Sequence, residues 1–168
     1  RLVVSSVRQV PNNCWPLELK CRSRMHYYLA DREAREREPG SRALLLDQDD
    51  FIAEASTASV ILYRSGEGFL SPPREKILPG VSVGVVEELA QEMGIAFLHR
   101  DLSVDDAYSA DEVLLCSTSP CLLPVVSLNG QPIGTGVAGA VFQQTVAAWS
   151  RFVGLDIVEQ ANRFAQRA

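Results

Sequence analysis

The chain has 168 residues, of which 46% are hydrophobic and 22% charged, and its formal net charge is −5. These values are typical of a soluble globular protein with one well-buried core. The acidic balance argues against nucleic acid or an anionic membrane as the main partner. No apolar run approaches the roughly 20 residues that a membrane-spanning helix needs.

Strand and helix patterns are mixed in the first half of the chain. Residues 1–10 are typical of a strand, which Pro11-Asn12-Asn13 ends. A helix is predicted over about 22–38, because apolar residues recur at helical spacing until Pro39-Gly40 stops it; they are Met25, Tyr28, Leu29 and Ala34. Further strands are predicted over 43–47, within 51–63 and over 69–71, with turns at 48–50 and 65–68.

The second half continues this mixture. A helix is predicted from about 81 to 93, after the Leu78-Pro79-Gly80 turn and before a capping Gly94. Asn129-Gly130 is the strongest hairpin signal in the chain. The remaining predictions are strands over 96–101, 112–117, 122–128 and 131–133, a short helix over 103–108, and helices over 137–153 and 155–168. The pattern indicates one α/β domain with a mixed sheet.

Lysine is rare in this chain, since only Lys20 and Lys76 are lysines among 16 Lys+Arg residues. Lys20 closes the apolar segment 14–19. A lysine held against apolar surface there could lose its proton and act as a nucleophile, as Schiff-base chemistry requires. The alternative is a surface lysine with a solvated ammonium group. Lys76 lies in a polar loop with two prolines and has no comparable context.

Three other segments place polar groups among apolar ones. Glu54 lies in the β-forming run 51–62, where a buried carboxylate needs a cationic or N–H partner; the alternative is an edge-strand residue facing solvent. The turn before residue 81 feeds a helix N-terminus that suits an anion, although Ser82 could simply cap the helix. Three hydroxyl residues, 117–119, follow a predicted strand, and loops at strand ends bind ligands in many α/β sheets. The alternative is a polar turn without a ligand.

The four cysteines suggest neither disulfides nor zinc. Cys14, Cys21, Cys116 and Cys121 include no CxxC pair and no Cys/His spacing that suits a metal. We therefore expect reduced thiols in a cytoplasmic protein and no metal site. Arg1 leads directly into a strand pattern, so we also expect a fragment, or a protein whose upstream portion is missing from this chain.

A set of segments in a fixed order extends over nearly the whole chain. It comprises Leu19-Lys20, 28–34, 54–59, 77–82, 110–113, Ser117-Thr118, Pro124-Val125, Asn129-Gly130 and Ile133-Gly134. This ordered set resembles the class IV, fold-type IV pyridoxal-phosphate enzymes, which include branched-chain and D-amino-acid aminotransferases and aminodeoxychorismate lyase. The resemblance implies the larger C-terminal domain of that fold, a pseudo-barrel of mixed strands with flanking helices.

The resemblance also implies roles around pyridoxal phosphate. Lys20 would form the Schiff base with the cofactor and move the Cα proton of the substrate. Glu54 would pair with the pyridine nitrogen and keep it protonated, so that the ring accepts electrons. Leu78 would pack against one face of the ring.

The remaining implied contacts involve the phosphate and the substrate. The backbone amides of Val81 and Ser82, the Ser82 hydroxyl and Thr118 would hold the phosphate. Thr118 and Ser119 would bind the substrate carboxylate. No role is implied for a metal ion.

Some positions depart from the family pattern. Val81-Ser82-Val83 stands where Ile-Thr-Arg is common, Ser59 stands where Asn is frequent, and residues 21–25 lack the usual Asn and Tyr. These changes lie on the cofactor and substrate side, so they bear on substrate identity more than on cofactor binding.

The function implied is amino-group transfer between an amino acid and a 2-oxo acid. One alternative is the lyase branch, which releases pyruvate and 4-aminobenzoate from aminodeoxychorismate, and another is a non-catalytic domain that keeps the fold. Family members are usually nearer 300 residues, so residues 1–168 would be the C-terminal cofactor domain, with the smaller N-terminal domain absent from this chain. A homodimer is expected, as in the family.

Overall fold

A computed structural model describes residues 1–166 of the chain. In chain order the elements are β1 (Leu2–Val4), a 3-10 turn (Leu17–Leu19), α1 (Met25–Arg37), β2 (Arg42–Leu46), β3 (Ile52–Ala55), β4 (Ala58–Arg64), β5 (Gly68–Ser71), a second 3-10 turn (Arg74–Lys76), α2 (Val81–Glu92), β6 (Phe97–His99), α3 (Val104–Tyr108), β7 (Glu112–Ser117), β8 (Cys121–Val125), β9 (Ser127–Leu128), β10 (Gln131–Pro132), α4 (Ala140–Val153) and α5 (Ile157–Ala165). The predicted α/β class with a mixed sheet is confirmed.

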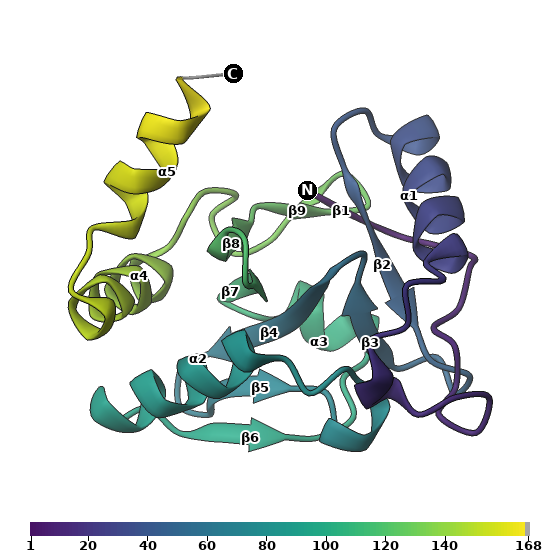
Figure 1. The fold of residues 1–168 in the computed structure, drawn as a ribbon, viewed down its shortest axis with the longest axis horizontal. Helices are drawn as coiled ribbons and strands as arrows, with labels where there is room; N and C mark the ends of the chain where they lie inside the picture. The colour runs from purple at the N-terminus through teal and green to yellow at the C-terminus, as the bar shows by residue number, and fades with distance from the viewer. Residues whose placement is uncertain (167–168) are drawn as a thin grey trace.

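The strands form one branched sheet whose main path is β10-β9-β1-β2-β3-β4-β5-β6. Three pairs are parallel, namely β1 with β2, β1 with β9, and β5 with β6, whereas the other pairs are antiparallel. The branch is at β4, because β7 pairs with β4 and with β8. Figure 1 shows α1 beside β2 on one flank of the sheet, and α4 with α5 on the other.

Strand alternation divides the interior into separate core clusters. In β4, Val60 and Leu62 belong to one cluster, whereas Ile61 between them belongs to a second. The first cluster takes residues from strands β1 to β5 and β7 to β9, together with α3; among them are Leu2, Leu44, Ile52, Leu70, Ala107, Val113, Val125 and Leu128. This core joins strands from both halves of the chain within one mixed sheet, as the predicted fold class requires.

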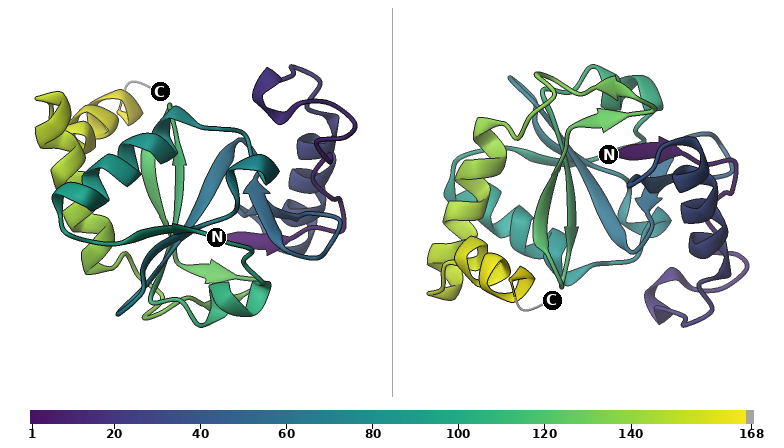
Figure 2. Two further views of the ribbon diagram at one scale, coloured as in Figure 1. Left: turned by 90° about the horizontal axis from the view of Figure 1, so that it is seen from below. Right: turned by 90° about the horizontal axis from the view of Figure 1, so that it is seen from above.

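Helices cover the outer faces of the sheet. The second cluster joins β4, β5 and β7 to α2 and α4 through Val86, Leu89, Val146 and Trp149, among others. The third joins β1 and β2 to α1. The two further views in Figure 2 show α1 and the α4–α5 pair again on opposite sides of the strands.

The buried face of α1 differs from the predicted one. Its fully buried residues are Ala30 and Ala34, whereas Met25, Tyr28 and Leu29 are exposed. Tyr28 and Leu29 do not lie on the face that carries the two alanines. Small side chains there let the helix approach β2 closely, so close packing, not the largest apolar residues, decides which face is buried.

Most predicted boundaries hold within a few residues, but the first strand is much shorter than predicted. It ends at Val4, because the next polar groups turn to α1: the Ser5 hydroxyl donates to Glu33 Oε2 at 2.6 Å, and the Ser6 backbone N–H donates to the same carboxylate. The predicted C-terminal helix is present as α5, and its last two predicted residues, 167–168, lie outside the described residues. Within residues 1–166, no helix combines the length and apolar character needed to cross a membrane.

Candidate functional site

A cavity of about 550 Å³ opens between the start of α1, the hairpin of β3 and β4, the start of α2 and the turn between β7 and β8. All seven residues for which the sequence predicts a role line it, namely Lys20, Glu54, Leu78, Val81, Ser82, Thr118 and Ser119. Strand pairing brings these segments together, because Ser59 of β4 faces Glu54 on one side and Cys116 of β7 on the other.

Lys20 follows the 3-10 turn and adopts a left-handed backbone conformation, with φ 45° and ψ 51°. Its backbone N–H donates to the Leu17 carbonyl, which closes the turn and sets the direction of the chain into α1. The residue is exposed, so the expectation that apolar surface covers this lysine is wrong for the chain as described. An exposed amine at the rim of the cavity remains accessible to a ligand inside it.

Lys76 has a different environment. Its Nζ forms salt bridges with Asp47 at 2.9 Å and with Asp101 at 2.7 Å, and it lies 5.0 Å from the centre of the Phe51 ring. Its hydrogen bond to Asp101 is the main reason that the pKa of Lys76 is raised to about 12. An amine that stays protonated and paired is a poor nucleophile, so the environment of Lys76 does not favour covalent chemistry.

Glu54 is the buried acid of the cavity, with only 3% of its surface exposed. It lies on β3 between β2 and β4, so the alternative of an edge-strand residue facing solvent is wrong. The Tyr27 hydroxyl donates to its Oε2 at 2.9 Å, and the Leu78 backbone N–H donates to its Oε1. Burial raises the pKa of Glu54, and these two hydrogen bonds act against that rise.

The expected N–H partner of Glu54 is therefore present, but both donors are neutral groups. Among residues 1–166, Glu54 forms no salt bridge with a lysine or an arginine. A buried carboxylate without a positive neighbour is costly, and a ligand that brings a cationic N–H group would remove much of that cost.

The turn 78–80 delivers the chain into α2 at the wall of the cavity. Ser82 is buried, and its side chain makes no hydrogen bond to another described residue, whereas Val81 is 75% exposed. The first N–H groups of a helix have no partner within that helix and carry its positive dipole end. Gly80 passes so near β4 that an added Cβ would lie 3.3 Å from Ser59 Oγ. These groups could bind an anion inside the cavity.

Thr118 and Ser119 form the exposed tip of the hairpin between β7 and β8. The hairpin closes with the pair Ser117 and Cys121, and Cys121 takes a positive φ of 57° that a tight connection often requires. The predicted strand-end loop is thus a hairpin turn, and it presents its hydroxyl and amide groups at the cavity.

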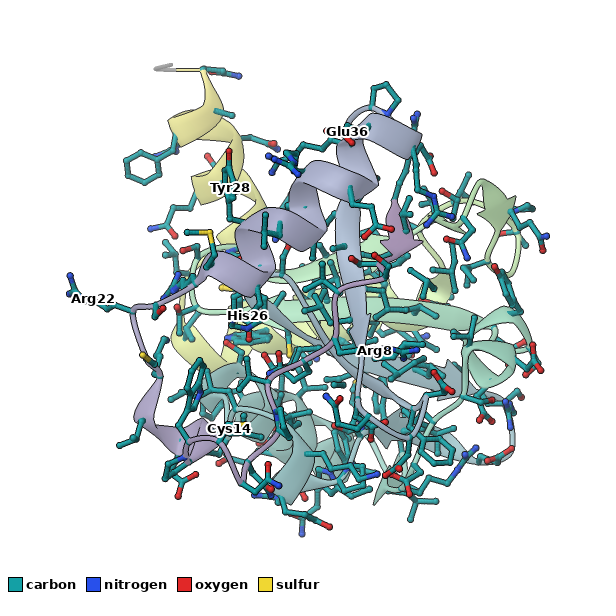
Figure 3. The ribbon with its side chains drawn as sticks, turned by 90° about the vertical axis from the view of Figure 1, so that its right-hand side faces the viewer. Arg8, Cys14, Arg22, His26, Tyr28 and Glu36 are labelled. Carbon is teal, nitrogen blue, oxygen red and sulfur yellow. The ribbon has the colours of Figure 1, made fainter. Side chains whose placement is uncertain are left out.

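Several cavity residues were not predicted from the sequence. They include Gln9, Trp15, His26, Tyr27, Arg42 and Thr57, and the charged groups of the lining besides Lys20 and Glu54 are Glu18, Arg24 and Arg42. The His26 and Tyr27 rings lie 4.0 Å apart, and Trp15 lies 6.4 Å from His26. Figure 3 shows His26 at the start of α1, with Arg22 and Tyr28 projecting outward. Tyr27 directly precedes segment 28–34, which is part of the family resemblance. That adjacency is the only feature of the sequence that drew attention to the neighbourhood of Tyr27.

The cavity therefore combines an accessible amine, a buried acid with neutral partners, and a helix N-terminus with a free hydroxyl. A ligand with a carbonyl carbon for the amine, a cationic nitrogen for the acid and an anionic group for the helix would satisfy all three.

Of the four cysteines, Cys14 and Cys21 are exposed, Cys116 is buried and Cys121 is partly buried, and all four are free thiols.

The sequence and the fold both match known proteins. Residues 1–128 match the family model described as amino-transferase class IV. The chain is 28% identical over 102 residues to the D-alanine aminotransferase of Staphylococcus aureus strain N315, which covers 61% of this chain and 36% of that protein. It is 29% identical over 148 residues to the branched-chain-amino-acid aminotransferase of Salmonella typhimurium, which covers 88% of this chain and 48% of that protein.

Solved structures give the same likeness. The T.th. branched-chain amino acid aminotransferase superposes with a TM-score of 0.83 at 28% identity, over 89% of this chain and 51% of that one. The same enzyme has been solved with pyridoxamine 5'-phosphate and with N-(5'-phosphopyridoxyl)-L-glutamate. The chain thus spans about a third to a half of the length of these relatives.

Proposed function

Because the chain belongs to the class IV aminotransferase family, we propose that it is the C-terminal, cofactor-binding domain of a pyridoxal-phosphate-dependent aminotransferase. The reaction is transfer of an amino group between an amino acid and a 2-oxo acid. The observation that carries this proposal is the meeting of Lys20, buried Glu54 and the start of α2 around one cavity. The family and the cofactor-bearing relatives support it.

The residues present fit pyridoxal phosphate. Glu54 lacks a cationic partner within residues 1–166, and a protonated pyridine nitrogen would supply one. The phosphate suits the N–H groups of Val81 and Ser82, the Ser82 hydroxyl and Thr118, all of which line the cavity. Leu78 would pack against one face of the ring. When bound, the cofactor supplies an aldehyde that captures amines and a ring that accepts electrons.

Lys20 carries the covalent and proton-transfer roles in this proposal. Its amine would hold the cofactor through the aldehyde carbon, and once released it would serve as the base that accepts the proton from the substrate Cα and passes it on. The exposed position of Lys20 at the cavity rim leaves its amine free to move between the two tasks. Glu54 keeps a proton on the ring nitrogen, and the turn at Thr118 and Ser119 orients the substrate carboxylate.

This domain spans only part of its relatives, so the complete substrate pocket is also a matter of proposal. We infer that a second, smaller domain and a second copy of the protein complete it. Leu19, Met25 and Tyr28 expose apolar surface beside the cavity segments, which is consistent with such a contact.

The test uses the purified full-length protein, with the further domain that completes the pocket. Pyridoxal phosphate, an amino acid and a 2-oxo acid are added, and the amino group is followed. Formation of a new amino acid from an added 2-oxo acid supports the aminotransferase. Release of 4-aminobenzoate from aminodeoxychorismate assigns the lyase branch instead. Cofactor uptake without either product, or no uptake at all, would identify a non-catalytic domain and contradict the proposal.

A further inference from the structure

Glu54 stands at the end of a chain of hydrogen bonds that begins at Gln9. The Gln9 side-chain Nε2 lies 3.4 Å from the Tyr27 hydroxyl, and that hydroxyl donates to Glu54 Oε2 at 2.9 Å. Three residues far apart in the sequence are thus linked through the Tyr27 hydroxyl: Gln9 before α1, Tyr27 on α1 and Glu54 on β3. All three line the cavity.

The direction of these bonds follows from the charge state of Glu54. When the carboxylate is ionised it can only accept, so the Tyr27 hydroxyl donates its single proton to Glu54. That hydroxyl then has only lone pairs left for Gln9, so Gln9 must donate through its amide nitrogen. The backbone of Gln9 is held as well, because its N–H donates to the Leu46 carbonyl and its carbonyl accepts from the Gln48 side chain. Gln9 is therefore a fixed support for Tyr27.

This donor orientation leaves one group unpaired within residues 1–166. Gln9 is only 5% exposed, and its Oε1 accepts no hydrogen bond from a described residue. Reversing the amide would pair neither group better, because the Tyr27 hydroxyl has no second proton to give.

We propose that Tyr27, oriented by Gln9, is a positioning residue that holds the Glu54 carboxylate ionised and aimed at the ring nitrogen of the cofactor. This inference rests on the proposed function. It assigns to residues of α1 and of the segment before it a role that neither Lys20 nor the start of α2 performs.

The electrostatic setting favours this role. Burial is the main cause that raises the pKa of Tyr27 well above its usual value, so the hydroxyl keeps its proton at neutral pH and remains a donor. Burial also lowers the pKa of His26, so the ring beside Tyr27 is neutral and does not replace the missing cation. Arg24 and Lys20 are exposed residues of the lining and form no salt bridge with Glu54.

The neighbouring tyrosine provides a matched control. Tyr28 is also on the first turn of α1, but it is 63% exposed and projects away from the helix (Figure 3). Tyr27→Phe and Tyr28→Phe each remove one hydroxyl from the same turn and keep the aromatic ring. Only Tyr27→Phe removes a donor from Glu54, so a general effect on the helix is separated from the proposed one.

Two readouts test the inference on the purified protein. The first is the dissociation constant for pyridoxal phosphate. We expect Tyr27→Phe to raise it, by about tenfold for each unit by which the loss of the hydroxyl raises the Glu54 pKa, because less of the carboxyl is then ionised for the ring nitrogen. The second is the pH at which Glu54 ionises in the cofactor-free protein, followed by the infrared band of its protonated carboxyl. We expect Tyr27→Phe to move this titration to higher pH. Tyr28→Phe should match the wild type in both.

A double-mutant cycle separates positioning from packing. In a Glu54→Gln background the carboxylate is gone, so Tyr27→Phe should change cofactor affinity much less than it does in the wild type. An equal effect in both backgrounds would mean that Tyr27 acts through packing, and it would overturn the inference.

The remaining outcomes are also distinct. If the wild type binds the cofactor and Tyr27→Phe behaves like Tyr28→Phe in both readouts, the inference fails and the proposed function stands. If the wild type takes up no pyridoxal phosphate, the proposed function fails and the inference falls with it.

Discussion

Replacing Glu54 by glutamine tests whether its buried charge serves a ligand or the fold. Glu54 is 3% exposed, and burial raises its pKa from the ordinary value of 4.5. An acid whose pKa is higher in the folded than in the unfolded state binds more protons when folded. The free energy of unfolding therefore falls as the pH rises from the unfolded to the folded pKa. Glutamine carries no such proton.

The structure sets the size and sign of the expected difference. The stability of the wild type relative to Glu54→Gln should fall with rising pH by up to about 1.4 kcal/mol per pH unit, in a window that begins near the ordinary carboxyl pKa. The comparison is made on cofactor-free protein, by urea unfolding at pH values from below that pKa to neutrality. Other titrating groups are common to both proteins and cancel.

Adding pyridoxal phosphate should stabilise the wild type more than Glu54→Gln. The wild type gains stability by binding, and Glu54→Gln gains less because it loses a charged contact with the ring nitrogen. A contact of this kind contributes about 1.5–3 kcal/mol, so the dissociation constant should rise about ten- to a hundredfold. Parallel stability curves without the cofactor, together with equal stabilisation by it, would refute the reasoning.

Two further substitutions test the fold around the site. An alanine Cβ at Gly68 (φ 97°) would lie 2.3 Å from the Ala96 carbonyl oxygen, whereas at Gly66 (φ 86°) it would meet nothing within 4 Å. In urea titrations we expect Gly68→Ala to be less stable than Gly66→Ala by about 2 kcal/mol or more. Equal losses of stability would contradict the predicted clash. Lys76→Met removes two salt bridges of a lysine whose raised pKa keeps it charged at neutral pH, so the substitution should cost about 1 kcal/mol of stability. Cofactor uptake, followed by absorbance, should be unchanged. Lost uptake would give Lys76 a role in the site.

The parts of the fold that depend on local chemistry followed from the sequence. Pro39-Gly40 after α1, the hairpin turn at 65–68 and the cap at Gly94 were predicted because turn residues act on the backbone next to them. The buried face of α1 was not predicted correctly, because Ala30 and Ala34 are buried through their fit against β2. Such a fit depends on a distant strand, and apolar periodicity does not reveal it.

In the candidate site, too, features that depend on local sequence were predicted, whereas contacts between distant segments were not. A buried carboxylate in a β-forming run indicated that Glu54 needs a partner, and the Leu78 N–H is one of the kind expected. Tyr27 was missed because it lies 27 residues from Glu54 in the sequence, and nothing in its own segment distinguishes it from Tyr28. The exposure of Lys20 was also missed, because it depends on which segments cover the rim of the cavity.

The central claim is that Lys20 is the residue that binds the cofactor covalently, and the composition of the chain allows a direct test. Because Lys20 and Lys76 are its only lysines, purified protein can be treated with pyridoxal phosphate and borohydride and then mapped by peptide mass spectrometry. We predict a pyridoxyl group on Lys20 and none on Lys76, which its two salt bridges keep protonated. A label on Lys76 alone, or no label on either lysine, would contradict this account.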